Sequence, residues 1–170
     1  PARTTQSGRV TFTDVSKEAG ILKEGYSLGA AISDVNNDGW PDIYVSNDFL
    51  SSDILYINNG HSPSPLGEGR GEVTFSDKTH ESLKHTSFAS MGSDVADFNN
   101  EWLRDIYTLD MLPEDNFRKK MIIPSASYDK FQLLLQKGYE PQYTRNALQL
   151  NNGSSPSPNG EGRGEVTFSD

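Results

Sequence analysis

Short apolar runs separated by turn residues make up the hydrophobic pattern of this chain. Small, β-branched and aromatic residues fill 29–35 and 42–46 on either side of an Asn-Asp-Gly turn, and a third run from 54 to 57 is closed by Asn-Asn-Gly. Runs of this length and composition, bounded by turn signals, are typical of β-strands. The pattern therefore predicts an all-β fold of short antiparallel strands, with about four strands in each unit.

One insertion, residues 113–144, departs from this pattern. Within it, large apolar side chains recur at helical spacing, namely Tyr128, Phe131, Leu134 and Leu135. Because Gly138 is able to end a helix, we predict one helix from about Ser127 to Lys137. The basic cluster 118–120 that precedes it is interpreted as a solvated turn or an ion-pair partner of the acidic surface, rather than as a nucleic-acid site.

The strand pattern is repeated along the chain. Phe12-Thr13-Asp14 returns as Phe75-Ser76-Asp77 and Asp34 returns as Asp97, so both landmarks move by 63 residues (75 − 12 and 97 − 34). Repeated units of short strands are typical of the blades of a β-propeller. Because two blades cannot close a ring, we predict a fragment of a β-propeller and expect the remaining blades of the full-length chain to be its partners.

Low-complexity segments divide the chain further. The segment 62–77 is almost identical to 155–170, differing only at Leu66 and Asn159, and its Pro, Gly and Ser content predicts a flexible surface loop that lengthens the links between blades. We assign four parts in chain order: a first blade (1–61), an SPSP insert (62–74), a second blade that contains the helical insertion (75–153), and a second insert with the start of the next repeat (154–170).

The stretch DVNNDGWPD, from Asp34 to Asp42, places oxygen-bearing side chains at alternate positions between two predicted strands. Hard cations such as calcium take about six to eight oxygen ligands, and loops supply these with alternating Asp or Asn residues, a backbone carbonyl and a sharp glycine turn. Gly39 would provide the positive φ of that turn. The sequence therefore predicts a strand-loop-strand calcium site whose ligands are Asp34, Asn36, Asp38, the carbonyl of Trp40, and Asp42.

Two alternatives to a calcium site stay open for this loop. The side chains could form an Asx-rich β-turn by accepting hydrogen bonds from backbone amides, with no metal. Magnesium is the second alternative, but it prefers a tight octahedron that retains several waters. Calcium is favoured because three carboxylates held within a few ångströms of one another repel unless a cation neutralises them.

A second loop, DFNNEWLRD from Asp97 to Asp105, keeps the spacing but replaces Asp-Gly by Glu101-Trp102. The extra methylene of Glu101 displaces its carboxylate, and Trp102 must adopt a left-handed conformation that costs a bulky residue about 1 kcal/mol or more. We therefore expect weaker calcium binding here than at the first loop, and whether this loop binds metal stays open. Its candidate ligands are Asp97, Asn99, Glu101, Leu103 at the position of Trp40, and Asp105.

The 170-residue chain carries a net charge of −9 and contains no cysteine. Such acidity disfavours nucleic acid as a partner, because phosphate backbones are bound by Lys and Arg, and it favours cations. The absence of cysteine removes disulfides and thiolate metal sites. The sequence contains no apolar run of the kind that predicts a membrane span or a signal peptide. Because its first residue is Pro1, we expect the sequence to be a segment of a longer protein.

Three motifs follow one another in the first unit: Phe-x-Asp, then Gly-x-x-x-x-Asp-x-Asn-x-Asp-Gly-x-x-Asp-Ile-Tyr, then Tyr-Ile-Asn-Asn-Gly. This combination resembles the FG-GAP/VCBS repeat family, which includes the calcium loops of integrin α-subunit propellers. Segments 118–121 and 139–153 are similar to large bacterial proteins with an N-terminal VCBS propeller and a C-terminal ASPIC/UnbV region, related to cartilage acidic protein. The resemblance implies an exported or cell-surface β-propeller with calcium in its hairpin loops, more securely in the first loop than in the second.

These observations lead to one function and one alternative. The chain is expected to be a non-enzymatic calcium-binding propeller module of an exported or cell-surface bacterial protein, for adhesion or for binding a protein or glycan. The alternative is the scaffold portion of an exported polysaccharide-processing enzyme. Enzymatic activity is disfavoured because the sequence has no Gly-x-Ser-x-Gly elbow and no zinc spacing among His61, His80 and His85, although carboxylate pairs for glycoside chemistry stay open.

Overall fold

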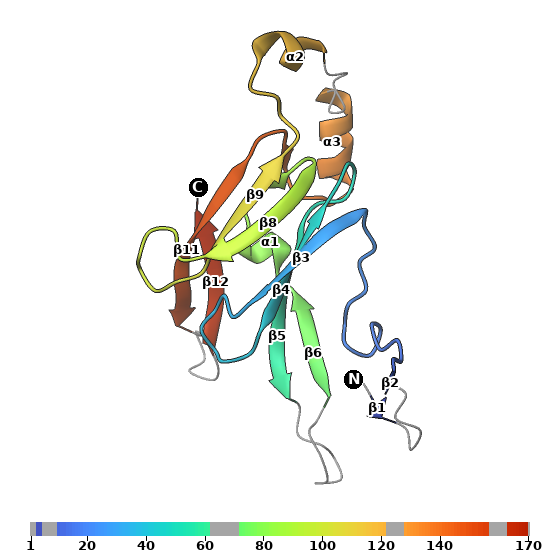
Figure 1. Cartoon of the computed structure of the whole chain (residues 1–170), viewed down its shortest axis with the longest axis vertical. Coiled ribbons are helices and arrows are strands. Elements are labelled where there is room, and N and C mark those ends of the chain that lie inside the picture. The colour runs from blue at the N-terminus through green and yellow to red at the C-terminus, as the bar shows by residue number, and fades with distance from the viewer. Residues whose placement is uncertain (1–2, 5–9, 62–71, 122–127, 157–162, 170) are drawn as a thin grey trace.

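Two four-stranded antiparallel sheets form the body of the computed structural model, which describes residues 3–4, 10–61, 72–121, 128–156 and 163–169 (Figure 1). The first sheet has the order β3-β4-β5-β6, with bounds Ser27–Ser33, Asp42–Asn47, Ile54–His61 and Val73–Asp77. The second has the order β8-β9-β11-β12, with bounds Ser90–Ala96, Asp105–Asp110, Ala147–Pro156 and Arg163–Ser169. This arrangement confirms the predicted all-β class and agrees with two blades of a propeller fragment.

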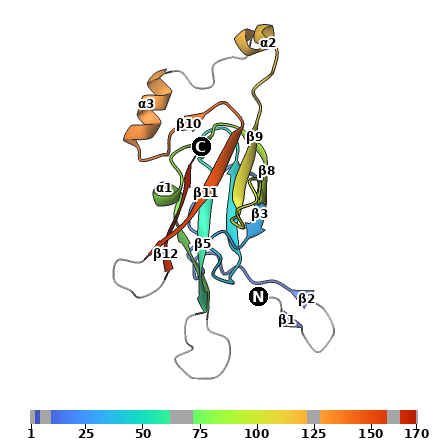
Figure 2. The same cartoon turned by 90° about the vertical axis from the view of Figure 1, so that its left-hand side faces the viewer.

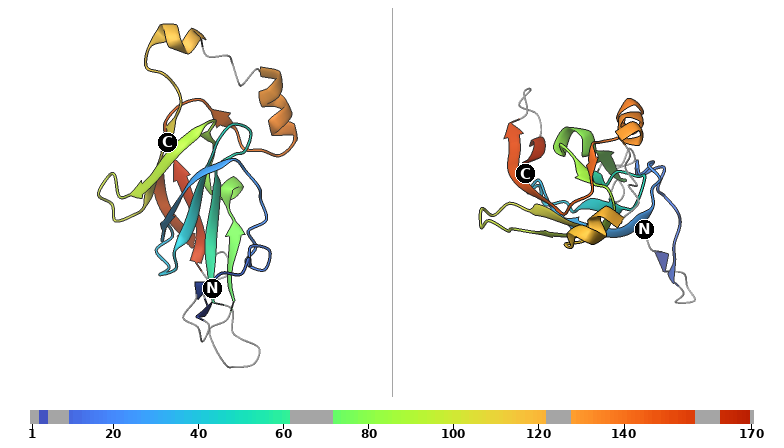
Figure 3. Two further views of the ribbon diagram at one scale, coloured as in Figure 1. Left: turned by 45° about the vertical axis from the view of Figure 1, so that its right-hand side comes forward. Right: turned by 90° about the horizontal axis from the view of Figure 1, so that it is seen from above.

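Smaller elements surround the two sheets. In the described residues they are two short strand pairs and three helices: β1 (Arg3–Thr4) with β2 (Val10–Thr11), β7 (Thr86–Ser87) with β10 (Gln142–Tyr143), α1 (Thr79–Ser82), α2 (Asn116–Met121) and α3 (Tyr128–Gln136). Figures 2 and 3 show α2 and α3 at one end of the sheets, with α2 projecting farthest from them. Among the described residues, none of the helices combines the length and apolar character that crossing a bilayer requires.

The three strands predicted in the first unit are present, with different ends. The Asn-Asn-Gly segment was expected to end the third strand, but β5 continues through it to His61. A register shift relative to β6 occurs between Asn58 and His61, and Gly60 has a φ of 73° while its N–H donates to Asn58 Oδ1 at 2.9 Å. The motif is therefore a β-bulge within the strand rather than a turn after it, because glycine lets the backbone bend without leaving the sheet.

The helix predicted from about Ser127 to Lys137 is confirmed as α3. The interpretation of 118–120 as a turn is wrong, because these residues lie in α2. Asp115 precedes this helix, and its Oδ1 accepts a hydrogen bond from Arg118 N at 2.8 Å, which is the role of an N-cap side chain. The described part of the insertion thus contains two helices, α2 and α3, where one was predicted, and α1 lies outside it.

The near-identical segments supply the fourth strand of each sheet. Phe75 of β6 pairs with Asn58 of β5, and Phe168 of β12 pairs with Asn151 of β11, so both copies use the same register. Each segment therefore lies within one sheet and lengthens a hairpin there. The expectation that the segments lengthen the links between two blades is wrong. The sheet boundary is thus displaced from the repeat boundary at residue 75. The prediction of a flexible loop over 62–77 and 155–170 is wrong for 73–77 and 163–169, because these residues form β6 and β12. Residues 62–71 and 157–162 of the two segments lie outside the described residues.

Apolar residues of both sheets, of the loop after β3 and of the C-terminal end of α1 form one core: Val35, Tyr44, Leu55, Leu83, Ile106, Val166 and Phe168. Polar contacts join the sheets beside it. Ser46 Oγ lies 3.0 Å from Ser93 Oγ, and Asp53 Oδ2 accepts hydrogen bonds from Tyr44 Oη and Ser90 Oγ, each at 2.7 Å. The two sheets are therefore held by an apolar core and by buried hydrogen bonds that cross between them.

Candidate metal centre

The first candidate loop connects β3 to β4, and Asp34 organises its backbone. Asp34 Oδ1 accepts a hydrogen bond from Asp38 N at 2.8 Å, and its Oδ2 accepts one from Gly39 N at 2.7 Å. Asn36 Oδ1 also lies 3.1 Å from Asp38 N. Gly39 has a φ of 86°, which confirms the predicted glycine turn. The side chains of Asp34 and Asn36 therefore hold the backbone of the loop in a tight turn through these hydrogen bonds.

Asp42 closes the loop from the start of β4, where it is 1% exposed. Its Oδ2 accepts a hydrogen bond from Val35 N at 2.9 Å and its Oδ1 accepts one from Asn58 N at 2.8 Å. Burial raises the pKa of Asp42 to about 6, and the negative charges of Asp38 and Asp34 add to this rise against the opposing hydrogen bonds. A buried carboxylate thus lies near two further carboxylates.

Asp38 is tied into the loop through both of its oxygens. Trp40 N donates to Asp38 Oδ1 at 2.7 Å, and Asn36 Nδ2 donates to Asp38 Oδ2 at 3.0 Å. The three predicted carboxylates of the first loop and Asn36 therefore all belong to one hydrogen-bonded turn. This backbone pattern is that of an Asx turn, and each carboxylate oxygen that accepts one N–H keeps a further lone pair for a cation.

The second loop, between β8 and β9, has the same pattern of side-chain to backbone hydrogen bonds as the first. Asp97 accepts hydrogen bonds from Glu101 N at 3.0 Å and from Trp102 N at 2.9 Å, and Asp105 accepts them from Phe98 N at 2.9 Å and Asn151 N at 2.8 Å. Asn99 Oδ1 lies 3.2 Å from Glu101 N. The backbone geometry of the two loops is therefore equivalent.

The fifth and sixth positions, Glu101 and Trp102 in the second loop, distinguish it from the first loop. Trp102 has a φ of 65°, which confirms the predicted left-handed conformation, and its side chain is 88% exposed. Within the described part of the chain, the carboxylate of Glu101 accepts no hydrogen bond, whereas Asp38 accepts two at the equivalent position. The carboxylate at the fifth position is thus held in place only in the first loop.

The two loops lie beside each other, which the sequence did not predict. Asn151 Nδ2 donates to Val35 O at 2.7 Å and to Arg104 O at 3.0 Å, and Asn37 Nδ2 lies 3.5 Å from Trp102 O. The repeated Asn-Asn-Gly motif was visible in the sequence, but nothing there assigned its first asparagine to this contact. One buried side chain of β11 therefore connects both candidate loops.

Oxygen ligands other than carboxylates are needed for a metal in either loop. In the part of the chain that the structure describes, no group of three or more His, Cys, Asp or Glu side chains is placed to hold a metal ion by itself. The predicted set adds the amide of Asn36 and the carbonyl of Trp40, and in the second loop the amide of Asn99 and the carbonyl of Leu103. Amide and carbonyl oxygens are ordinary calcium ligands, so the chemistry of the donor set fits this ion.

Comparison with protein families matches the segment that holds both loops. Residues 34–108 match the family model of the FG-GAP-like repeat. The matched FG-GAP-like segment begins at Asp34, the first predicted ligand, and extends through the second loop into β9. It supports the FG-GAP part of the resemblance drawn from the motifs. Comparison of the chain with curated proteins and with solved structures gives no match in either set.

Proposed function

We propose that the loop from Asp34 to Asp42 binds calcium and that this ion stabilises a non-enzymatic propeller module. Following the motif resemblance, the module belongs to an exported or cell-surface bacterial protein of the VCBS and ASPIC/UnbV type. It serves adhesion or the capture of a protein or glycan ligand. The FG-GAP-like match over residues 34–108 supports the propeller part of this proposal.

The main support for the calcium proposal is that the first loop holds three carboxylates close together without a positively charged partner among the described residues. Asp42 is buried, and its pKa is raised to about 6 by burial and by the charges of Asp38 and Asp34. Within the described residues, none of the three aspartates forms an ion pair with Lys or Arg. A divalent cation would remove this repulsion and use the lone pairs that the backbone N–H groups leave available.

The second loop is proposed to bind calcium more weakly. Its Asp97, Asn99 and Asp105 have the same hydrogen bonds as their counterparts, but Glu101 must be ordered when the ion binds. Ordering a long side chain costs conformational entropy that Asp38, already held by two hydrogen bonds, does not lose. The difference in affinity between the loops should therefore arise at the fifth position.

Further blades are proposed to cover surfaces that these two sheets leave open. The sequence from Val10 to Asp14 repeats that of β6 and of the last residues of the second copy, 166–170. Phe12 is 84% exposed, whereas its counterpart Phe168 is 1% exposed against the second sheet. On β3, the first strand of the first sheet, Ile32 is 70% exposed. Exposed apolar side chains on a repeat element are typical of surfaces that a neighbouring repeat covers.

Thermal unfolding with and without calcium tests the proposal. A calcium concentration about 100 times the dissociation constant should stabilise the 170-residue chain by about 2.7 kcal/mol relative to excess chelator. Asp38→Asn should reduce this response by weakening the first site. Asp129→Asn, the same change at an exposed residue of α3, is the matched control and should keep it. A melting temperature that ignores chelator in the unmodified chain would refute an occupied loop.

Glycan and polysaccharide assays separate the binding module from the alternative. A glycan array probed with the 170-residue chain in calcium should show retention without turnover if the chain captures a glycan. Products released from a polysaccharide by the chain would instead support an enzymatic role and contradict the non-enzymatic proposal. The same array in chelator shows whether ligand binding depends on the loop.

A further inference from the structure

The helix α2 exposes large apolar side chains. Phe117 is 71% exposed and Met121 is 67% exposed, and no residue of α2 is buried against the described part of the chain. Residues four positions apart lie on one face of a helix, so Phe117 and Met121 form one apolar stripe. Short helices in proteins are stabilised mainly by packing such a stripe against another surface. The stripe of α2 therefore has the character of a contact surface.

Three positively charged residues surround this stripe. Arg118, Lys119 and Lys120 are exposed, and none of them forms an ion pair with a described residue. The ion pair with the acidic surface that the sequence analysis offered for this cluster is therefore not formed there. With about 3.6 residues per turn, Arg118 and Lys120 lie on the two flanks of the stripe and Lys119 lies opposite it. The helix thus combines an apolar face with cationic flanks.

The charge of α2 is opposite to that of the rest of the chain. The helix sequence NFRKKM has a charge of +3, so the other residues together carry −12 (−9 less +3). Figures 2 and 3 show α2 as the helix that lies farthest from the sheets. At physiological salt, exposed charges are screened beyond about 8 Å. The helix can therefore approach an anionic surface while the acidic body stays away from it.

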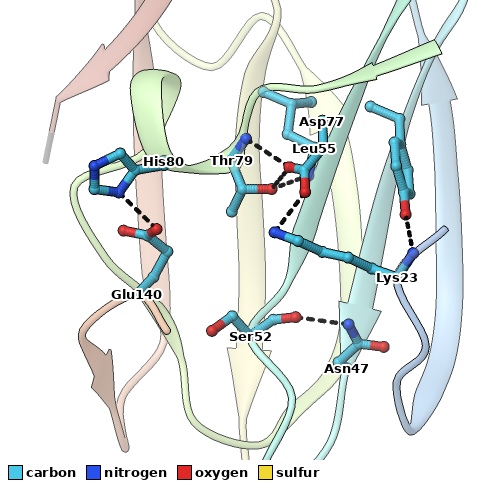
Figure 4. A network of polar contacts seen from close by, with 9 residues as sticks. Lys23, Asn47, Ser52, Leu55, Asp77, Thr79, His80 and Glu140 are labelled. Carbon is cyan, nitrogen blue, oxygen red and sulfur yellow. Dashed lines mark hydrogen bonds and ion pairs between the residues drawn. The ribbon is translucent and has the colours of Figure 1, made fainter. Parts of the chain in front are cut away.

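Contacts at the base of the insertion hold it on the two sheets. Nδ1 of His80 in α1 lies 2.8 Å from Oε1 of Glu140, which follows α3 (Figure 4). Gln142 of β10 pairs with Thr86 of β7, and its Nε2 donates to Ser52 Oγ at 3.0 Å. Because α2 lies farther from the sheets than α3 does, these contacts leave α2 at the outer end of the insertion (Figure 3).

We propose that α2 binds the surface of an anionic phospholipid membrane. Phe117 and Met121 enter the boundary between headgroups and acyl chains, while Arg118 and Lys120 extend toward the lipid phosphates. A membrane surface places a layer of negative charge directly beside an apolar layer, so it matches the stripe and its flanks at once. One short helix gives weak and reversible attachment, and this attachment is independent of calcium in the loops.

Vesicle flotation of the 170-residue chain in chelator tests the proposal. The chain should float with vesicles that contain phosphatidylglycerol, stay behind with pure phosphatidylcholine, and be released by about 0.5 M NaCl. Arg118→Gln combined with Lys120→Gln should lower the partition coefficient about 25-fold, since each Lys or Arg beside an anionic leaflet contributes about fivefold. Lys17→Gln combined with Lys84→Gln removes the same charge from exposed residues of the body and should leave binding nearly unchanged.

A second pair of variants tests the apolar stripe. Phe117→Ala should weaken binding about tenfold, whereas Leu22→Ala, at a residue that is 69% exposed elsewhere, should not. Full affinity in Phe117→Ala with loss in the charge variant would assign α2 to an acidic protein or another polyanion and overturn the lipid proposal. The absence of binding to the anionic vesicles would also overturn it. Binding that requires calcium would place the contact at the acidic loops, so this proposal and the calcium proposal fail independently.

Discussion

Four non-glycine residues of the described chain adopt a left-handed conformation, and all four lie in loops that follow strands. Two are asparagines, Asn37 and Asn100, which tolerate this region because their short side chains bond locally. The other two are Phe49 and Trp102, for which the conformation is costly. Phe49 follows β4 and Trp102 lies in the second candidate loop, so the strained backbone of Trp102 falls within a candidate metal loop.

Replacing Trp102 by glycine should stabilise the second loop. The indole is 88% exposed, so its removal sacrifices little burial, while glycine adopts a φ of 65° without steric cost. Trp102→Gly should therefore be more stable than Trp102→Ala by about 1 kcal/mol, because alanine keeps the Cβ that causes the strain. Urea unfolding in chelator measures the difference. Equal stability of the two variants would show that the left-handed conformation is not strained.

At the scale of elements, the third strand of each sheet contains an asparagine whose side chain donates a hydrogen bond to the candidate loop of the same sheet. Asn58 Nδ2 donates to Pro41 O at 2.9 Å, and Asn151 Nδ2 donates to Arg104 O at 3.0 Å. Only Asn151 makes an additional hydrogen bond to the other sheet, to Val35 O at 2.7 Å. The repeated motif thus has one role within each sheet and a second role between the sheets.

Asn151→Ala should therefore destabilise the chain more than Asn58→Ala. Both changes remove the bond to the loop and the bond that the Oδ1 atom accepts from Gly153 N or Gly60 N. Asn151→Ala also leaves Val35 O without its donor between the sheets, which should add about 1 kcal/mol. Chemical denaturation of both variants tests this difference. A cost for Asn58→Ala as large as that for Asn151→Ala would mean that the bond between the sheets contributes nothing.

The sequence predicted the positions of individual strands and loops better than it predicted which elements pair or pack together. Apolar runs and Asx-rich turns located β3, β4 and both loops, because these signals are local. The pairing of Phe75 with Asn58 could not be read from the chain, since the repeat suggested that Phe75 begins a new unit. The contact between Asn151 and Val35 spans 116 residues and depends on how the sheets pack. These two misses are long-range, whereas the β-bulge at Gly60 and the helix α2 with its Asp115 cap are local features that the sequence analysis misread.

At the scale of the whole molecule, Asp53 connects the two sheets. It is fully buried, accepts hydrogen bonds from Tyr44 in one sheet and Ser90 in the other, and accepts a third from Asn47 N at 2.8 Å. The equivalent residue of the second sheet is Asn146, whose Oδ1 accepts a hydrogen bond from Asp110 N at 2.9 Å. An asparagine therefore serves at the same place in the repeat, which makes Asp53→Asn a conservative change.

Asp53→Asn should alter how stability depends on pH. Burial raises the pKa of Asp53 from 3.8 to about 6. Between these values the native state binds more protons than the unfolded state, so Asp53 stabilises the fold at low pH, and this contribution is lost as pH rises through about 6. Stability of the unmodified chain should therefore fall, relative to Asp53→Asn, by about 2 kcal/mol between pH 4 and pH 7. Urea unfolding in chelator at both pH values measures it, with Asp129→Asn as the exposed control that should follow the unmodified chain. The hydroxyls of Tyr44 and Ser90 are able to accept as well as donate, so an asparagine at position 53 can keep both hydrogen bonds. Parallel pH profiles for the two chains would therefore show that the pKa of Asp53 is not raised. They would also show that no buried charge destabilises the contact between the sheets.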